Sequence, residues 1–269
     1  MTREHAGRIA FVTGSGRGLG RLMAEKIARR GADIVLHDLD FTAPAKYGEA
    51  KDLGEVEAQF AEFGVRTTHV TGNIGDAKAV AAMRAHIEET LGPVDILVNC
   101  AGGDIGAAGG KPVPNNALDI PLEDVQALVN NNLVGTITVC KEFIIPMRER
   151  GSGTVVNIGS VAGHLGVSDG AIYAILKAAV AHYTRCLARE LTEHGVRVNC
   201  VAPGPAKTAR FEATREVDPR RMDSSGKSFD RYAEPEEIAD AVAFLTGRES
   251  KFINGQILCV DGGLICWPS

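Results

Sequence analysis

The sequence lacks long apolar runs and an excess of basic residues. No apolar run reaches the roughly 18 residues that indicate a membrane-spanning helix, and residues 1–5 (MTREH) lack the apolar stretch of a signal peptide. We therefore expect neither export nor membrane anchoring, and a cytoplasmic location. The formal net charge is -5 and the pI is near 5.8. Because nucleic-acid binding normally needs a basic face, nucleic acid is not expected as a partner.

Cysteines and aromatic residues are also few. The six cysteines form no C-x-x-C pair, which argues against a zinc site or a disulfide framework, so no metal is expected. Trp267, the only tryptophan, lies in the C-terminal tail (residues 264–269), which either packs on a neighbouring subunit or is a simple apolar anchor. The cysteines lie in apolar segments and are predicted to be reduced core thiols: Cys100, Cys140, Cys186, Cys200, Cys259 and Cys266.

Glycine, by contrast, is concentrated in one turn near the N-terminus. Residues 9–12 predict a strand, residues 22–28 have helical periodicity, and residues 13–20 between them read TGSGRGLG. Such a turn needs glycine because its backbone adopts conformations that side chains disfavour, and because a diphosphate must approach the amides at the helix N-terminus. The spacing is T-G-x-x-x-G-x-G rather than G-x-G-x-x-G. Taken alone it also fits an ordinary surface turn, so the surrounding sequence has to decide.

An acidic residue ends the second predicted strand, residues 33–38. Asp38 lies 18 residues beyond Gly20. A carboxylate there accepts hydrogen bonds from the adenosine ribose hydroxyls and repels a 2′-phosphate, which predicts NAD rather than NADP. Arg17 acts in the opposite direction, but no second arginine follows Asp38. The alternative interpretation of Asp38 is a solvated loop carboxylate.

The rest of the N-terminal half continues the alternation of strands and helices. Helices are predicted at 55–63 and 77–90, and strands at 67–70 and 94–99, the last continuous in Val, Ile and Leu as buried parallel strands are. The alternation predicts an α/β, doubly wound parallel sheet. The Gly- and Pro-rich segment 103–121 is expected over the carboxyl ends of the strands, where such sheets bind ligands.

Four polar residues in the second half form a candidate catalytic set. Tyr173 and Lys177 are four residues apart on a predicted helix, 170–191, and so share one face. Free tyrosine has a pKa of about 10, and a neighbouring ammonium favours its phenolate, a base for a hydroxyl proton. Ser160 follows a strand at 154–158 and would hold the reacting oxygen. Asn132, in an apolar helix, would hold a relay water. Taken singly, each also has an ordinary structural explanation.

Together these motifs closely resemble the short-chain dehydrogenase/reductase family over nearly the whole chain. The resemblance rests on TGxxxGxG at 13–20, Asp38, NxAG at 99–102, NLVG at 132–135, Ser160, YxxxK at 173–177, Pro203-Gly204 followed by Thr208, and the ending at 255–263. Asn73 and Cys100 depart from the residues common in the family. The resemblance implies one dinucleotide-binding and catalytic domain (residues 1–269) with a Rossmann fold, mostly a seven-stranded parallel sheet.

It also implies a catalytic tetrad of Ser160, Tyr173, Lys177 and Asn132, and a homotetramer, which the apolar sides of helix 171–191 support. The residues expected to bind the NAD cofactor are Gly14, Ser15, Arg17, Gly18, Leu19, Gly20, Asp38, Asn73, Ile74, Asn99, Ala101, Gly102, Tyr173, Lys177, Pro203, Gly204 and Thr208.

The substrate is predicted from the segment 205–232, which resembles the family's substrate lid and is rich in basic residues. We expect a small polar molecule such as a sugar, sugar acid or hydroxy acid, with one lid arginine holding a carboxylate. The alternative interpretation is a solvated lid whose charges only keep it soluble. The leading prediction is an NAD-dependent interconversion of a secondary alcohol and a ketone. The alternatives are a 3-oxoacyl carrier-protein reductase using NADPH and a non-catalytic nucleotide-sensing relative.

Overall fold

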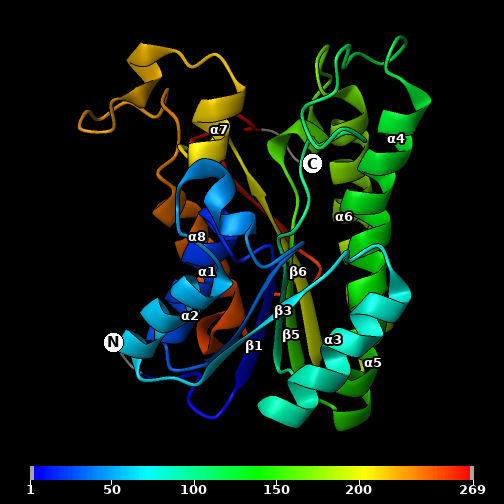
Figure 1. Cartoon of the computed structure of the whole chain (residues 1–269), viewed down its shortest axis with the longest axis vertical. Coiled ribbons are helices and arrows are strands. Elements are labelled where there is room, and N and C mark those ends of the chain that lie inside the picture. The colour runs from blue at the N-terminus through cyan, green and yellow to red at the C-terminus, as the bar shows by residue number, and fades with distance from the viewer. Residues whose placement is uncertain (1–2, 267–269) are drawn as a thin grey trace.

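Seven parallel strands form the centre of the structure, a computed structural model that describes residues 3–266 (Figure 1). Their order is β3-β2-β1-β4-β5-β6-β7. Because the order changes direction between β1 and β4, the carboxyl ends of these two strands mark the crevice where such sheets bind ligands. The strands are β1 (Ile9–Thr13), β2 (Asp33–Asp38), β3 (Thr67–Thr71), β4 (Ile96–Asn99), β5 (Gly153–Ile158), β6 (Val196–Pro203) and β7 (Ile257–Val260).

Helices cover both faces of the sheet, which confirms the predicted fold (Figure 1). One layer contains α1 (Gly18–Arg29), α2 (Leu53–Phe60) and α8 (Pro235–Thr246), and the other contains α3 (Ala77–Thr90), α5 (Gly135–Arg150) and α6 (Ala171–Glu190), with α4 (Leu122–Val129) packed on α6. Val12 packs under the first layer and Phe11 under the second. Both faces of each central strand are therefore buried, which explains the continuous apolar runs.

Some predicted boundaries differ from those observed. β4 starts at Ile96, one residue after Asp95, whose carboxylate accepts a hydrogen bond from the backbone N–H of Ile9 (N to Oδ2, 2.9 Å). α2 starts at Leu53, where Asp52 caps the helix by accepting a hydrogen bond from the N–H of Glu55 at 2.9 Å. Its predicted last turn is a separate 3₁₀ turn, Ala61–Phe63.

β6 and β7 were implied only by the family resemblance. β7 is a short apolar run (ILCV), whereas β6 has no clear apolar signal. Arg197 and Asn199 interrupt the apolar pattern of β6. Both donate to the backbone carbonyl of Ile253, at 3.2 and 2.9 Å, in the segment that leads into β7. These polar residues therefore join two adjacent strands rather than end one.

Two helices are predicted here from the sequence, one from about residue 122 and one ending at Arg150. In the structure they are continuous, with a π-helical turn, Asn130–Val134, between α4 and α5. Such turns are frequent at functional sites because they redirect one side chain. Here the side chain of Asn132, 1% exposed, faces the loop after β4.

The prediction of six core thiols is only partly correct. Cys140 and Cys200 are buried, and burial raises the pKa of each to about 12, so these thiols stay protonated. Cys186 and Cys266 are exposed, and for them the prediction was wrong. An apolar neighbourhood in sequence does not specify which side of a helix a residue occupies, and Cys186 lies on the outer side of α6. Trp267 lies outside the described residues. No helix within residues 3–266 is long and apolar enough to cross a membrane.

Candidate active site

The glycine turn after β1 packs directly on the loop after β4. Gly14 has φ of +68°, and a Cβ there would lie 2.9 Å from the Cα of Ala101. A Cβ on Gly20 would overlap the carbonyl of Gly14. The turn therefore closes on itself only with glycine at these positions, which places the start of α1 where a diphosphate could approach it. Thr13 fixes the neighbouring loop, because its Oγ1 accepts from the N–H groups of Cys100 and Ala101, both at 3.0 Å.

A buried polar network holds the turn from below. The hydroxyl of Ser15, fully buried, donates to the carbonyl of Val12 at 2.7 Å and accepts from the N–H of His37 at 2.9 Å. The ring of His37 accepts from the Gly14 N–H at Nδ1 (3.1 Å), and its Nε2 lies 3.1 Å from the carbonyl of Gly72. This arrangement requires the neutral Nε2–H tautomer, and burial lowers the pKa of His37 to about 4.

Sequence reasoning missed Thr13 and His37 as positioning residues. The available signal was a histidine inside an apolar strand, directly before Asp38. The same network places the Ser15 side chain under the turn rather than on its open side, and the Ser15 N–H donates to the carbonyl of His37 at 2.8 Å.

Asp38 and Arg17, predicted to favour opposite cofactors, lie next to each other. The Asp38 carboxylate is 8% exposed, accepts from the Leu39 N–H at 2.9 Å and lies 4.0 Å from the Arg17 Nε. Burial raises the pKa of Asp38, while the Leu39 N–H and the Arg17 charge oppose that rise. A Cβ on Gly16 would lie 2.8 Å from Asp38 Oδ2, so the carboxylate abuts the glycine turn. Arg17 also stacks over the Tyr47 ring, 5.0 Å from its centroid.

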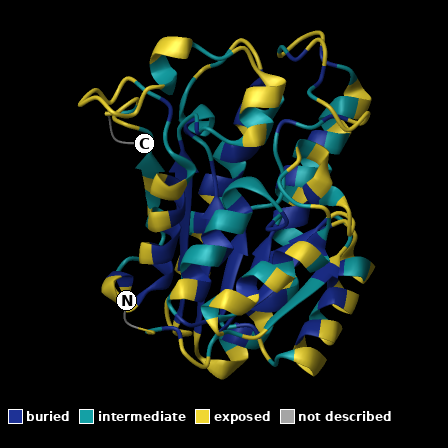
Figure 2. Cartoon of the chain, turned by 60° about the vertical axis from the view of Figure 1, so that its left-hand side comes forward, coloured by how far each residue is buried: buried dark blue, intermediate teal, exposed yellow. Residues whose placement is uncertain are grey.

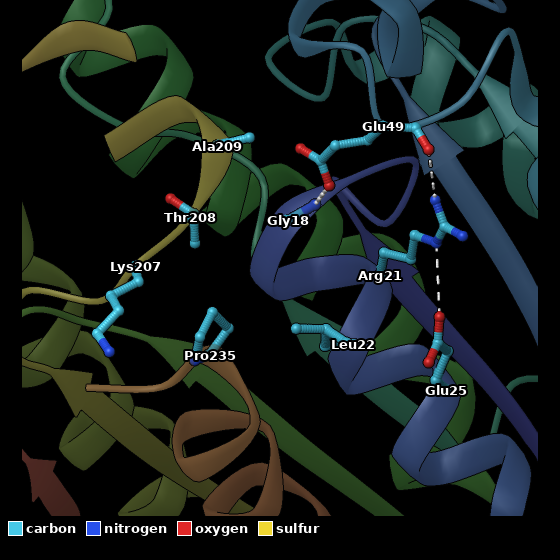
Figure 3. Close-up of a pocket in the computed structure, with 9 residues that line it drawn as sticks. All are labelled: Gly18, Arg21, Leu22, Glu25, Glu49, Lys207, Thr208, Ala209 and Pro235. Carbon is cyan, nitrogen blue, oxygen red and sulfur yellow. Dashed lines mark hydrogen bonds and ion pairs between the residues drawn. The ribbon is translucent and has the colours of Figure 1, made fainter. Parts of the chain in front are cut away.

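A cavity of about 300 Å³ lies between the N-terminus of α1 and the segment after β6 (Figure 3). The predicted cofactor residues Gly18 and Thr208 both line it. Glu49, which the sequence did not single out, reaches into it and accepts from the Gly18 N–H (Oε2 to N, 2.7 Å). A carboxylate thus occupies the favourable anion position at the start of α1. The lining residues are Gly18, Arg21, Leu22, Glu25, Glu49, Lys207, Thr208, Ala209 and Pro235.

The segment after β6 is held by its neighbour β7. The N–H of Gly204 donates to the carbonyl of Val260 at 2.9 Å, and a Cβ on Gly204 would lie 2.9 Å from the Cα of Asp261. Thr208 caps α7 (Ala209–Thr214), since its Oγ1 accepts from the Phe211 N–H at 3.1 Å. Pro203 is the last residue of β6. These residues therefore stand opposite the glycine turn.

The remaining predicted cofactor residues have different surroundings. Asn73 is exposed and turns its Oδ1 to the N–H of Gly75 at 2.8 Å, whereas Ile74 is buried. Asn99 points into the interior, where its Nδ2 donates to Asn157 Oδ1 at 2.8 Å. Gly102 has φ of +128°, a conformation that glycine adopts without strain.

Tyr173 and Lys177 lie side by side on α6. The Lys177 ammonium is 5.6 Å from the centroid of the Tyr173 ring and donates to the carbonyl of Ile158 at 2.8 Å. Lys177 is 6% exposed, so its charge acts on the phenol with little screening by water. The bond to Ile158 ties α6 to the end of β5, one residue before Gly159-Ser160.

Ser160 begins the 3₁₀ turn Val161–His164, which packs on α6. A Cβ on Gly163 would lie 2.6 Å from the backbone N of Ala178, so the two backbones touch beside Lys177. The Ser160 Oγ accepts from the Ala162 N–H at 3.2 Å. The structure thus brings Ser160 to the element that carries the tyrosine and the lysine.

The Asn132 side chain bonds to the loop after β4 and to its own helix. Its Oδ1 accepts from the Gly103 N–H at 2.8 Å, and its Nδ2 donates to the carbonyls of Gly103 at 2.9 Å and Leu128 at 3.0 Å. No hydrogen bond joins its side chain to Lys177 within residues 3–266. Its visible action is to fix the loop after β4, and its relay role stays a prediction.

Comparisons with known proteins agree with this arrangement. A family profile described as enoyl-(acyl carrier protein) reductase matches residues 14–265. A cyclohexanol dehydrogenase of Rhodococcus sp. (strain TK6) is 37% identical over 265 residues, 96% of each chain. A 3-oxoacyl-(acyl-carrier-protein) reductase of Vibrio harveyi is 32% identical, covering 96% of this chain and 97% of the relative. A cis-4-hydroxycyclohexanecarboxylate dehydrogenase of Sinomonas cyclohexanicum is 33% identical over 98% of both chains.

Among solved structures, a 7α-hydroxysteroid dehydrogenase in complex with NADH and 7-oxo-glycochenodeoxycholic acid superposes with a TM-score of 0.83 at 28% identity, covering 97% of this chain and 96% of the other. Within residues 3–266 no cluster of three or more His, Cys, Asp or Glu side chains is arranged to hold a metal ion. The chain belongs to the short-chain dehydrogenase/reductase family and is an NAD(P)-dependent oxidoreductase that acts on alcohol and ketone groups.

Proposed function

We propose that this chain is an NAD-dependent dehydrogenase that interconverts a secondary alcohol and a ketone on a small polar substrate, such as a sugar acid, a hydroxy acid or a hydroxylated ring. The observation that carries the proposal is the buried ammonium of Lys177, 5.6 Å from the Tyr173 ring, at the same sheet edge as the glycine cradle. Two of the relatives named above act on ring alcohols, and one of these alcohols carries a carboxylate.

The residues present fit a bound dinucleotide. The amides at the start of α1 and the glycine turn fit its diphosphate, Asp38 fits the ribose hydroxyls, and Thr208 and Gly204 border the opposite side of the crevice. When bound, NAD supplies the acceptor for the hydride that leaves the alcohol carbon.

The proton follows a path made by the chain's own side chains. The Tyr173 phenolate takes the proton from the substrate hydroxyl as the C–O bond gains double-bond character. The Lys177 ammonium lies beside the Tyr173 ring, and Ser160 donates a hydrogen bond to the reacting oxygen. In the reverse direction the Tyr173 hydroxyl returns the proton to the alkoxide oxygen.

Asp38 supports NAD as the cofactor. Its carboxylate lies beside the glycine turn and pairs with Arg17. The positive charge of Arg17 is therefore already balanced by Asp38 at the place where a 2′-phosphate would bind. The second candidate is a 3-oxoacyl carrier-protein reductase using NADPH. The Vibrio relative favours it, and Asp38 argues against its cofactor.

Residues 205–232 form the proposed substrate lid of a single catalytic domain. They include α7 and lie above the carboxyl ends of the strands, mostly as exposed loops (Figures 1 and 2). We also infer a homotetramer. It is supported by Ile175 on α6, an apolar side chain that is 60% exposed in the single chain.

The test is to supply NAD or NADP with polyols, sugar acids, hydroxy acids and cyclohexanols and to follow the absorbance of the reduced cofactor. Tyr173→Phe removes the proton acceptor, and we expect kcat to fall by roughly 10²- to 10⁴-fold while NADH binding, measured by fluorescence, is retained. Tyr183→Phe, the same change on the same helix, is the control and should keep its activity. An unchanged kcat in Tyr173→Phe would refute the assignment.

A further inference from the structure

The basic residues of the segment 205–232 differ in whether they have partners. Arg215 stacks on the Phe211 ring at 5.5 Å, and Lys227 is exposed. Arg210 also forms no ion pair with a carboxylate within residues 3–266, but its guanidinium hydrogen-bonds across the crevice. The other four pair with acidic residues: Lys207 with Glu234, Arg220 with Asp218, Arg221 with Asp230 and Arg231 with Glu237.

Arg210 points inward, across the crevice, to the loop that follows β4. Its Nη1 donates to the carbonyl of Gly102 at 3.3 Å and its Nη2 to the carbonyl of Asp104 at 3.5 Å. A Cβ on Gly103 would overlap the guanidinium, so glycine at this position makes room for it. Both bonds are long and go to neutral acceptors, and they engage only part of the five-donor guanidinium.

The guanidinium is half-buried and lies in the electrostatic field of Tyr173. Burial lowers the pKa of Arg210, and the charge of a Tyr173 phenolate acts against that fall. The group nevertheless stays cationic, because arginine does not lose its proton in proteins. The nearby carboxylate of Asp104 accepts from Asn115 Nδ2 at 2.8 Å instead. A half-buried cation without an anionic partner is less stable than a paired one, and a bound carboxylate would supply that partner.

We propose that Arg210 binds the carboxylate of the substrate, and so selects hydroxy acids over uncharged alcohols whose hydroxyl reaches Tyr173. A guanidinium pairs with a carboxylate through two parallel N–H···O bonds, which sets the orientation of the bound acid as well as its affinity. The inference rests on the proposed function, because it takes Tyr173 as the end of the site where the alcohol reacts.

The test measures binding rather than turnover, on protein saturated with NADH so that no alcohol is oxidised. Titration calorimetry compares two matched pairs: cyclohexanecarboxylate with cyclohexanecarboxamide, and gluconate with glucitol. We expect the native chain to bind at least one carboxylate more tightly than its neutral partner. Arg210→Leu should weaken binding of that carboxylate by roughly 10- to 100-fold and leave the neutral ligand within about twofold. Arg210→Lys should lie between them, because it keeps the charge but loses the planar fork.

Arg220→Leu, in the same segment, is the control and should change neither ligand, because Arg220 is exposed and paired with Asp218. Three outcomes overturn the proposal. In the first, the native chain binds neither carboxylate more tightly than its neutral partner. In the second, Arg210→Leu weakens binding of the carboxylate and of its neutral partner equally. In the third, Arg210→Leu weakens NADH binding and leaves the preference for the carboxylate intact, which would assign Arg210 to the cofactor phosphates. Failure of the proposed function can be told apart from failure of this proposal. It would appear in the Tyr173→Phe activity assay, whereas the binding titrations do not require the ligand to be oxidised.

Discussion

Neutralising Glu49 should strengthen cofactor binding. The Glu49 carboxylate accepts the Gly18 N–H at 2.7 Å, at the start of α1, where a cofactor diphosphate needs the same donor (Figure 3). The two anions therefore compete. Glu49→Gln keeps a neutral acceptor of nearly the same shape, so the variant changes the charge and little else.

The magnitude follows from the one bond that is weakened. A hydrogen bond to a charged group is worth about 1.5–3 kcal/mol and a neutral one about 0.5–1.5 kcal/mol, a difference of about 1 kcal/mol. Displacing the side chain of residue 49 from the Gly18 N–H therefore costs the cofactor about 1 kcal/mol less in the variant. This corresponds to a dissociation constant for the cofactor that is about fivefold lower. Loss of the repulsion between the carboxylate and the diphosphate acts in the same direction. Because Glu49 is partly exposed, salt should reduce the effect.

The assay is titration of NADH by fluorescence at low and high salt, with thermal unfolding of the free protein in parallel. Glu25→Gln is the matched control, because Glu25 lines the same cavity and pairs with Arg21 at 3.5 Å without contacting Gly18. The free Glu49→Gln protein should also unfold at a slightly lower temperature, since it loses a charged cap. Weaker NADH binding in Glu49→Gln, or an equal gain in Glu25→Gln, would refute the competition.

Two further predictions concern the end of β2. Asp38→Ala should shift the ratio of kcat/KM for NAD over NADP by roughly 10- to 100-fold toward NADP, because it removes the ribose acceptor and releases Arg17. Asp40→Ala is the control, because Asp40 is exposed and lies two residues after Asp38. An unchanged ratio in Asp38→Ala would contradict the assignment. The pKa of His37 falls from 6.5 to about 4 on folding, so between these pH values the unfolded chain binds more protons than the folded chain. The free energy of unfolding, measured with urea, should therefore decrease as the pH is lowered from about 6.5 to about 4. The decrease due to His37 is at most about 1.4 kcal/mol per pH unit. His37→Gln should show a smaller dependence but not none, because burial also lowers the pKa of His5 to about 4, and an undiminished pH dependence would exclude His37 as a source.

Sequence reasoning found the features that depend on local spacing. A strand, a glycine turn and a helix are specified by residues within one another's reach, and Tyr173 and Lys177 share a face because four residues make one helical turn. β6 was harder, because Arg197 and Asn199 interrupt its apolar pattern. Their donors are satisfied by a carbonyl more than 50 residues away, at Ile253, and no local pattern indicates that.

The sequence by itself determined the parallel sheet, the glycine cradle, the acidic end of β2 and the tyrosine–lysine pair, since each follows from periodicity, glycine conformation or helical spacing. Only the tertiary structure decided which loop residues meet in the crevice. Glu49 contacts Gly18 across 31 residues, and Arg210 contacts Gly102 across 108. Seven basic residues in the segment 205–232 look alike in sequence. Arg210 differs because folding turns it across the crevice, where it bonds backbone carbonyls and no carboxylate. Burial and partners are properties of the packed chain, and they distinguish a binding residue from a solvated one.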